Sequence, residues 1–165
     1  MMIPAHKNVS YRRSVDEWSR LFYNLGTEMK AVSDEILKQI EGYLRIFMEV
    51  LFLENLLERL KEYLQMEDTI SFEEFSGFYN ELIEELNQSF DHLDQDARIK
   101  ALYICSVVQS NADSRIRESK STAKAFKKMS AKSGFWKDAI KFHLGKNGMT
   151  AQEIEQATEA INSGV

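Results

Sequence analysis

Residues 71–90, SFEEFSGFYNELIEELNQSF, decide the fold class of this 165-residue chain. Ser71 and Glu74 form a capping box: the serine hydroxyl accepts a hydrogen bond from an N–H of the first helical turn, and the glutamate reaches back to the serine N–H. Apolar residues then recur at helical spacing: Phe75, Phe78, Tyr79, Leu82, Ile83, Leu86 and Phe90. We therefore expect a helix over about residues 72–92 with one buried face.

The same patterns predict helices on both sides of this stretch. Capping boxes at Ser14–Glu17 and Thr150–Glu153 predict helices over 15–32 and 150–163. Between the first of these and Ser71, an apolar stripe predicts a long helix over about 34–66, and the sequence leaves open whether Gly42 bends it. A fourth helix is expected to begin at Asp94 or Asp96, because an acidic residue accepts hydrogen bonds from free N–H groups at a helix start.

Residues 114–148 differ from the rest because they are rich in lysine and poor in large apolar residues. We expect two shorter helices here. Their expected apolar anchors are Phe126, Met129, Phe135, Trp136, Ile140 and Leu144.

Together these elements predict an all-α fold, a single-domain helical bundle of about five to six helices, one of them long. A single proline and seven glycines leave little material for the turns of many short strands. The expected domain spans 1–165, with an N-terminal arm over 1–13, a basic segment over 114–148 and a C-terminal helix over 150–163. This length is that of one ordinary domain.

The cysteine count and the hydropathy pattern predict a cytoplasmic protein. Cys105 is the only cysteine and lies in an apolar run, so no internal disulfide is possible and a buried thiol is expected. The most apolar window, 44–53, is interrupted by Arg45 and Glu49, so we expect neither a signal peptide nor contact with a membrane.

No catalytic, cofactor or metal pattern stands out, so we expect neither an enzyme, nor a cofactor, nor a metal. His6, His92 and His143 are far apart in sequence, and none has a second ligand at a spacing that shares its helical face. Residues 63–74 resemble the end of a calcium-binding loop but carry Tyr63 and Asp68 where a ligand and a glycine are required. Clustered glutamates on the predicted third helix are most simply a solvated face.

Charge is divided unevenly along the chain. Residues 34–96 hold 17 acidic and 4 basic residues, a net charge of −13, whereas residues 114–148 hold 10 basic and 2 acidic residues, a net charge of +8. The overall net charge of −5 hides this difference. The placement of charge is therefore more informative about partners than the total.

The basic segment carries the candidate binding residues. Arg117, Lys120, Lys124, Lys127 and Lys128 would share one face if the segment were a single helix, which suits contact with a phosphate backbone. Such a face can equally meet the acidic helices of its own bundle, or only water. Residues that could add to the contact are Lys132, Lys137, Lys141, Arg12 and Arg13.

Two functions fit this pattern. The first is a non-enzymatic helical subunit of a larger nucleoprotein assembly that contacts a nucleic-acid backbone without sequence specificity, since lysine acts as a flexible point charge. In general character the chain is similar to the small helical subunits of CRISPR effector complexes, although no motif carries that likeness. The alternative is a protein–protein adaptor or self-stacking homo-oligomer, in which the basic face of one copy docks on the acidic face of the next.

Overall fold

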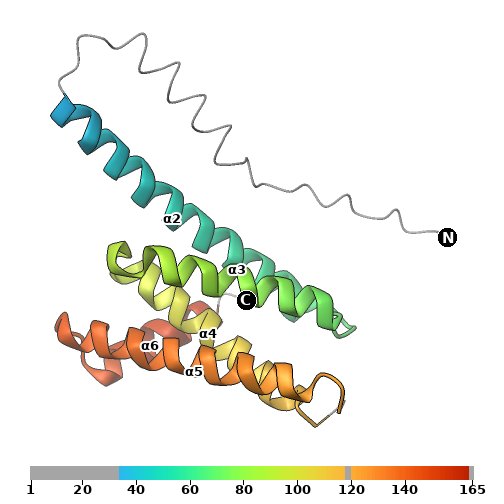
Figure 1. The fold of residues 1–165 in the computed structure, drawn as a ribbon. Coiled ribbons are helices and arrows are strands. Elements are labelled where there is room, and N and C mark those ends of the chain that lie inside the picture. Colours follow the sequence, from blue (N-terminus) through green and yellow to red (C-terminus); the bar gives the residue numbers. More distant parts are fainter. Residues whose placement is uncertain (1–33, 118–119, 164–165) are drawn as a thin grey trace. The chain divides into compact units, whose positions relative to one another are not determined.

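The computed structural model describes residues 34–117 and 120–163 (Figure 1). All regular elements among them are helical, which confirms the predicted all-α bundle. The predicted helix 15–32 and the arm 1–13 with Arg12 and Arg13 lie outside the described residues. The chain divides into two compact units at Gly42, and the candidate site lies in the second, Tyr43–Val165. The expectation of one domain stays a prediction.

The first two described helices follow the sequence pattern closely. Helix α2 spans Asp34–Gln65 and Gly42 does not interrupt it, so the long helix expected over 34–66 is confirmed. Helix α3 spans Phe72–Ser89 and begins with the predicted capping box, in which Ser71 Oγ accepts from Glu74 N at 3.1 Å and Glu74 Oε2 accepts from Ser71 N at 3.0 Å. A short 3-10 helix, η1, continues over Phe90–His92.

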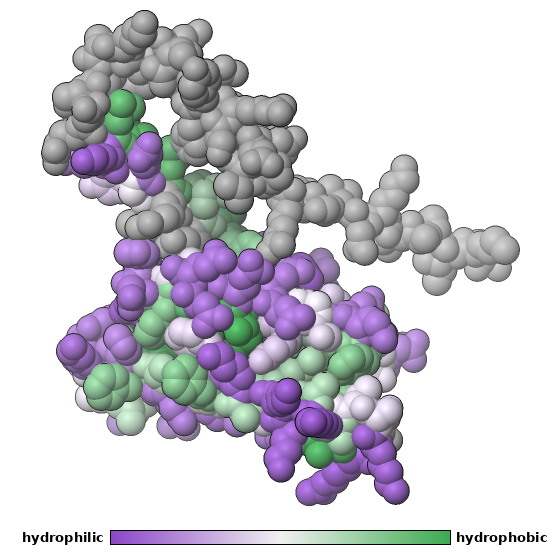
Figure 2. Space-filling model, viewed as in Figure 1, coloured by the Kyte–Doolittle hydropathy of each residue, from purple (hydrophilic) through white to green (hydrophobic). Residues whose placement is uncertain are grey.

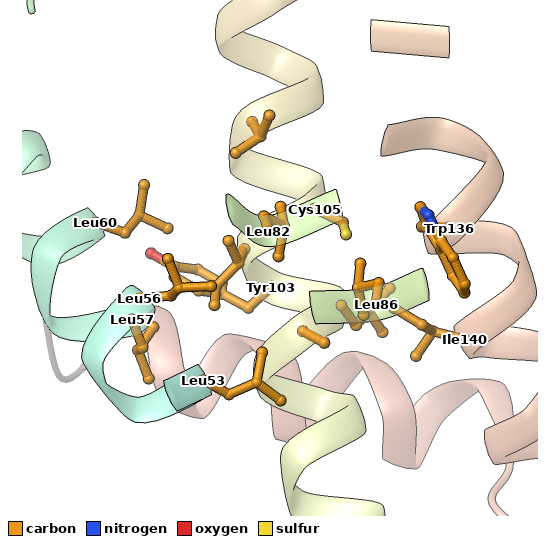
Figure 3. Packing of buried hydrophobic residues seen from close by; sticks show 14 of the residues in the cluster. Leu53, Leu56, Leu57, Leu60, Leu82, Leu86, Tyr103, Cys105, Trp136 and Ile140 are labelled. Atoms are coloured by element: carbon orange, nitrogen blue, oxygen red, sulfur yellow. The ribbon is translucent and has the colours of Figure 1, made fainter. Parts of the chain in front are cut away.

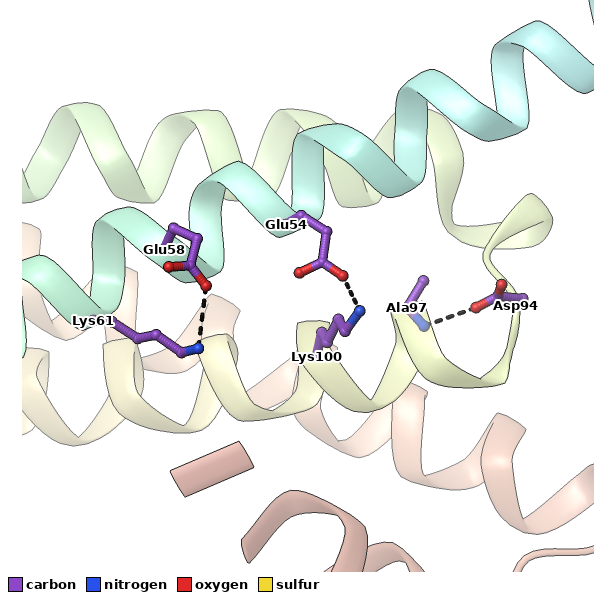
Figure 4. A network of polar contacts seen from close by, with 6 residues as sticks. All are labelled: Glu54, Glu58, Lys61, Asp94, Ala97 and Lys100. Atoms are coloured by element: carbon purple, nitrogen blue, oxygen red, sulfur yellow. Dashed lines mark hydrogen bonds and ion pairs between the residues drawn. The ribbon is translucent and has the colours of Figure 1, made fainter. Parts of the chain in front are cut away.

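Helix α4, Gln95–Arg115, is the central helix of the second unit. Its cap is Asp94, whose Oδ1 accepts from Ala97 N at 2.8 Å, which resolves the choice between Asp94 and Asp96 (Figure 4). Lys100 pairs with Glu54 of α2, and Tyr103 Oη donates to Asn162 Oδ1 at 3.2 Å. Because α4 has neighbours on several sides, apolar residues surround it instead of forming a single stripe, and Cys105 is fully buried.

The last two helices are α5, Ala123–Lys146, and α6, Ala151–Asn162. The predicted capping box of α6 is confirmed, since Thr150 Oγ1 accepts from Glu153 N at 3.2 Å. The two shorter helices expected between 114 and 148 are wrong, because α5 runs unbroken through Gly134. That glycine allows a close approach to α4: a Cβ at this position would lie 2.8 Å from Gln109 Nε2.

The hydrophobic core of the second unit draws side chains from every helix (Figure 3). Leu53 and Leu56 of α2, Leu82 of α3 and Ile140 of α5 each have no exposed surface. Burying a leucine or isoleucine side chain contributes about 1.5–3 kcal/mol, so these contacts hold α5 to the bundle through one face. The opposite face of α5 is therefore fixed in its outward orientation.

Candidate nucleic-acid interface

The basic segment does not form one helix. Arg117 and Lys120 therefore do not share a helical face with Lys124, Lys127 and Lys128. Residues 116 and 117 and residues 120–122 lie in turns, and α5 begins only at Ala123. The segment before α5 is rich in serine and threonine, whose hydroxyls compete with helical hydrogen bonds and favour turns. Arg117 and Lys120 are exposed in this turn, directly ahead of the helix that carries the other predicted lysines.

Three predicted lysines do share the outer face of α5. Lys124, Lys127 and Lys128 are exposed and lie in the first two turns of the helix. At about 100° per residue, Lys124 and Lys128 lie about 40° apart around the helix axis, and Lys127 lies about 60° to the other side of Lys124. We call the surface formed by these lysines and by the exposed residues farther along the same side the α5 outer face.

The remaining predicted residues of α5 occupy different surroundings. Lys141 is exposed at the side of the helix. Lys132 is partly exposed, with Nζ 4.8 Å from the centroid of the Phe135 ring. Lys137 points toward α4, where Nζ donates to Gln109 Oε1 at 2.6 Å. Lys137 is therefore held within the bundle and contributes little to an outer surface.

The acidic helices pair with cations other than those of α5. Among residues 34–117 and 120–163, one ion pair joins Arg59 to Glu81 at 2.5 Å. Two others, drawn in Figure 4, join Lys61 to Glu58 at 3.1 Å and Lys100 to Glu54. None of these pairs in the described part of the chain involves a lysine of α5. The sequence left open that the basic face meets the acidic helices of its own bundle. No ion pair within the described ranges supports this alternative.

The position of these lysines along α5 matters as well as their number. The first turn of α5 has no acidic residue. A helix start carries a partial positive charge, so a cation there is disfavoured by about 0.3–1 kcal/mol. Lys124 therefore adds to a positive potential that Arg117 and Lys120, in the preceding turn, strengthen. An anion near this end would be stabilised by the side chains and by the helix dipole together.

Two phenylalanines complete the α5 outer face. Phe135 is 57% exposed and Phe142 is 68% exposed, whereas Trp136 is buried. The expectation that Phe135 anchors the core is therefore wrong, because in a single continuous helix it lies about 170° from the face formed by Phe126, Ile140 and Leu144. Sequence reasoning missed Phe142, although its spacing of seven residues from Phe135 places both on one side.

The α5 outer face therefore carries both basic and aromatic side chains. Hydrophilic and hydrophobic residues are mixed over the part of the molecule where α5 and α6 lie (Figure 2). Helix α5 contains seven lysines and one acidic residue, Asp138, which is exposed on the Lys127 side of the outer face. Cationic and aromatic side chains on one rigid helix can contact both the phosphates and the bases of a nucleic acid.

A second exposed surface lies on α2. Five large apolar side chains of the second unit form it, and their exposed fractions range from 37% to 74%. We call them the α2 apolar stripe: Tyr43, Leu44, Phe47, Met48 and Leu51. From residue 53 onward the core residues of α2, such as Leu53 and Leu60, lie roughly 160° around the helix from this stripe. The core that buries the end of α2 therefore cannot also bury the stripe.

Other kinds of site are absent from the part of the chain that the structure describes. No group of three or more His, Cys, Asp or Glu residues in that part is placed to hold a metal ion. None of its helices has the length and apolar character needed to cross a membrane. Burial raises the pKa of the Cys105 thiol to about 12, against a small opposing effect of Lys137, so this cysteine is protonated and shielded.

Comparisons with protein-family models, with curated proteins and with solved structures found no match to this chain.

Proposed function

We propose that this protein is a non-enzymatic helical subunit of a nucleoprotein assembly, with a role like that of the small subunits of CRISPR effector complexes. In this proposal the α5 outer face contacts a nucleic-acid backbone without sequence specificity. The observation that carries the proposal is the exposure of Lys124, Lys127 and Lys128 at the positive end of α5, with no acidic residue in the first turn.

The residue types favour backbone contact over base-specific contact. Bidentate recognition of bases uses arginine, asparagine and glutamine, whereas the described cations of α5 are all lysines. Lysine neutralises phosphates as a point charge and releases their counterions, which gives binding that depends strongly on salt. Arg117 and Lys120 in the preceding turn extend the same potential past the end of the helix.

The test is a titration of labelled oligonucleotides at several salt concentrations. The logarithm of the association constant should fall linearly with the logarithm of salt concentration, by about 0.7–0.9 for each phosphate contacted. The variant K120Q/K124Q/K127Q/K128Q should lose measurable binding while its helicity and melting temperature stay nearly unchanged, because all four side chains are exposed. Absence of binding by the unmodified chain at low salt contradicts the proposal.

The α2 apolar stripe supports a second candidate function, self-association. Apolar residues at 36, 40, 43, 47 and 50 recur at alternating intervals of four and three, the pattern of a coiled-coil seam. Leu37, Leu44 and Leu51 flank it at intervals of seven. We propose that a second copy of the chain packs against this seam, since the pattern is self-complementary and a two-fold dimer brings identical surfaces together.

The size of the surface suits such a dimer. Ile36 and Ile40, in the part of α2 that belongs to the first unit, are also exposed. The five residues of the stripe alone expose on the order of 600 Å², at the upper end of the about 300–600 Å² found for the largest apolar patch on a typical monomer. A standard interface takes about 800 Å² from each partner.

Mass in solution tests this second candidate and separates it from acidic-to-basic stacking. A dimer held by the stripe should persist at 1 M salt, whereas stacking between charged faces should dissociate there, because the Debye length falls to about 3 Å. Phe47→Glu should convert the dimer to a monomer, and the exposed control Gln88→Glu should not. A monomer at every concentration and salt contradicts the dimer.

A further inference from the structure

We propose that the nucleic acid on the α5 outer face is single-stranded, and that two of its bases stack on Phe135 and Phe142. This inference rests on the proposed function and names the class of ligand. A duplex hides its base faces inside the helix and offers a protein mainly phosphates and groove edges. A single strand leaves base faces free for aromatic side chains, whichever base is present.

The two rings and the lysines lie along one line. At about 100° per residue, Phe135 and Phe142 are about 20° apart around the helix axis, and Lys124 and Lys128 lie within about 40° of both. At 1.5 Å per residue the rings are about 10 Å apart along α5, and the whole line is about 27 Å long. This spacing lets one extended strand meet cations at one end and aromatic rings at the other.

Each ring contacts an aromatic neighbour, which is buried Trp136 for Phe135 and half-buried His143 for Phe142. Phe90 contacts Trp136 and His143, with ring centroids 5.1 Å and 4.8 Å apart. Trp136 in turn meets Phe135 edge-on at 5.6 Å, and His143 meets Phe142 edge-on at 5.8 Å. The exposed rings are therefore supported by neighbours that the core holds in place. A rigid ring loses little conformational freedom when a base stacks on it, so such support favours binding.

Charge around the rings distinguishes this surface from a protein-docking patch. Lys132 Nζ lies 4.8 Å from the centroid of the Phe135 ring, and Lys128 and Lys146 are exposed on the same side of the helix. A phosphate on this side would meet three cations and no acidic residue of α5, whereas on the other side Asp138 lies between Lys127 and Lys141 along the helix and partly offsets their charge. The strand is therefore expected to follow the Lys128–Lys132 side. The α2 apolar stripe, in contrast, has no described lysine among its residues.

The experiment measures binding of one labelled 12-nucleotide oligonucleotide as a single strand and as a duplex, at fixed low salt. The unmodified chain should bind the single strand at least tenfold more tightly. Phe135→Leu/Phe142→Leu keeps apolar side chains but removes both rings, so single-strand affinity should fall at least tenfold with duplex affinity unchanged. Phe135→Tyr/Phe142→Tyr keeps the rings and should bind as the unmodified chain does.

A matched control is Tyr43→Leu, which removes an aromatic ring that is 74% exposed on α2. It should leave both affinities unchanged. Circular dichroism and melting curves check that each variant is folded. Equal affinity for single strand and duplex, or a single-strand preference that survives the leucine substitutions, overturns the stacking proposal and leaves the proposed function standing. No binding to either form at low salt overturns both.

Discussion

Helices α2 and α5 both expose large apolar side chains, but the neighbours of those side chains differ. On α2, Tyr43, Phe47 and Leu51 form a stripe that continues a leucine-rich seam. On α5, Phe135 and Phe142 are exposed among lysines. Exposed apolar area costs free energy in water on either helix, so each surface is expected to be covered in a complex.

The difference indicates what kind of partner covers each surface. An apolar seam is complementary to another apolar seam, because the hydrophobic effect has no directional or charge requirement. Exposed aromatic rings among lysines are complementary to a nucleic acid strand, because its phosphates are negatively charged and its bases are flat. In our proposals each helix therefore has a different task, self-association for α2 and nucleic-acid binding for α5.

The largest expected effect separates the inner and outer faces of α5. Ile140→Ala should lower the free energy of unfolding by about 2–5 kcal/mol, because the side chain is fully buried. Phe142→Ala should change it by less than about 0.5 kcal/mol, because the ring is 68% exposed. Both effects can be measured by the rate at which a thiol reagent labels Cys105. Burial and a raised pKa protect this thiol in the folded chain, so labelling reports unfolding. Equal losses would mean that the outer ring is part of the core.

A pair of substitutions tests whether the two tasks are independent. Phe47→Glu should raise the dimer dissociation constant at least 100-fold and leave nucleic-acid affinity of the monomer within about twofold, because it introduces a charge into the seam. The variant K124Q/K127Q/K128Q should do the reverse. Sedimentation and fluorescence anisotropy measure the two properties. If either change affected both, the division between α2 and α5 would be wrong.

A smaller effect distinguishes two lysines of the same helix. Lys128→Gln should weaken single-strand binding several-fold and lower the salt slope by about 0.7, the value for one phosphate contact. Lys137→Gln removes the same charge but should weaken binding by less than about twofold, since its ammonium is bonded to Gln109 within the bundle. Anisotropy titrations at several salt concentrations compare them. Equal slopes for the two variants would contradict the assignment of the outer face.

The smallest expected effect is a gain of affinity. Asp138→Asn removes the one acidic residue of α5, so binding of a single strand should tighten by about threefold at low salt. The gain should vanish at high salt, where screening is complete over a few ångströms. The same titrations report it. A weaker complex would indicate that Asp138 makes a favourable contact with the ligand.

The parts of the fold that depend on neighbouring residues were predictable. The capping boxes at Ser71 and Thr150 involve residues three positions apart, so the sequence places them without knowledge of the fold, whereas for α4 it left the choice between Asp94 and Asp96 to the structure. The start of α5 was not predicted correctly. Periodic lysines suggested a helix through residue 117, whereas the hydroxyl-rich residues before Ala123 form turns.

The candidate site was predictable only as a region. The excess of positive charge over 114–148 is visible in the sequence, as are Lys124, Lys127 and Lys128. Which of the other cations face outward depends on the path of α4 and the packing between α4 and α5. Lys137 is directed to Gln109 by that packing, and lysine periodicity alone carries no information about it.

The sequence by itself determined the all-α class, the capping boxes of α3 and α6 and the separation of acidic from basic segments, because these follow from contacts within a few residues and from a count of charges. The tertiary structure decided which face of each helix is buried, since that depends on residues far apart in the chain. By burying Trp136 and Ile140 against Phe90 and the core, it turned Phe135 and Phe142 outward beside the lysines. A row of positive charge thus became a surface with aromatic rings.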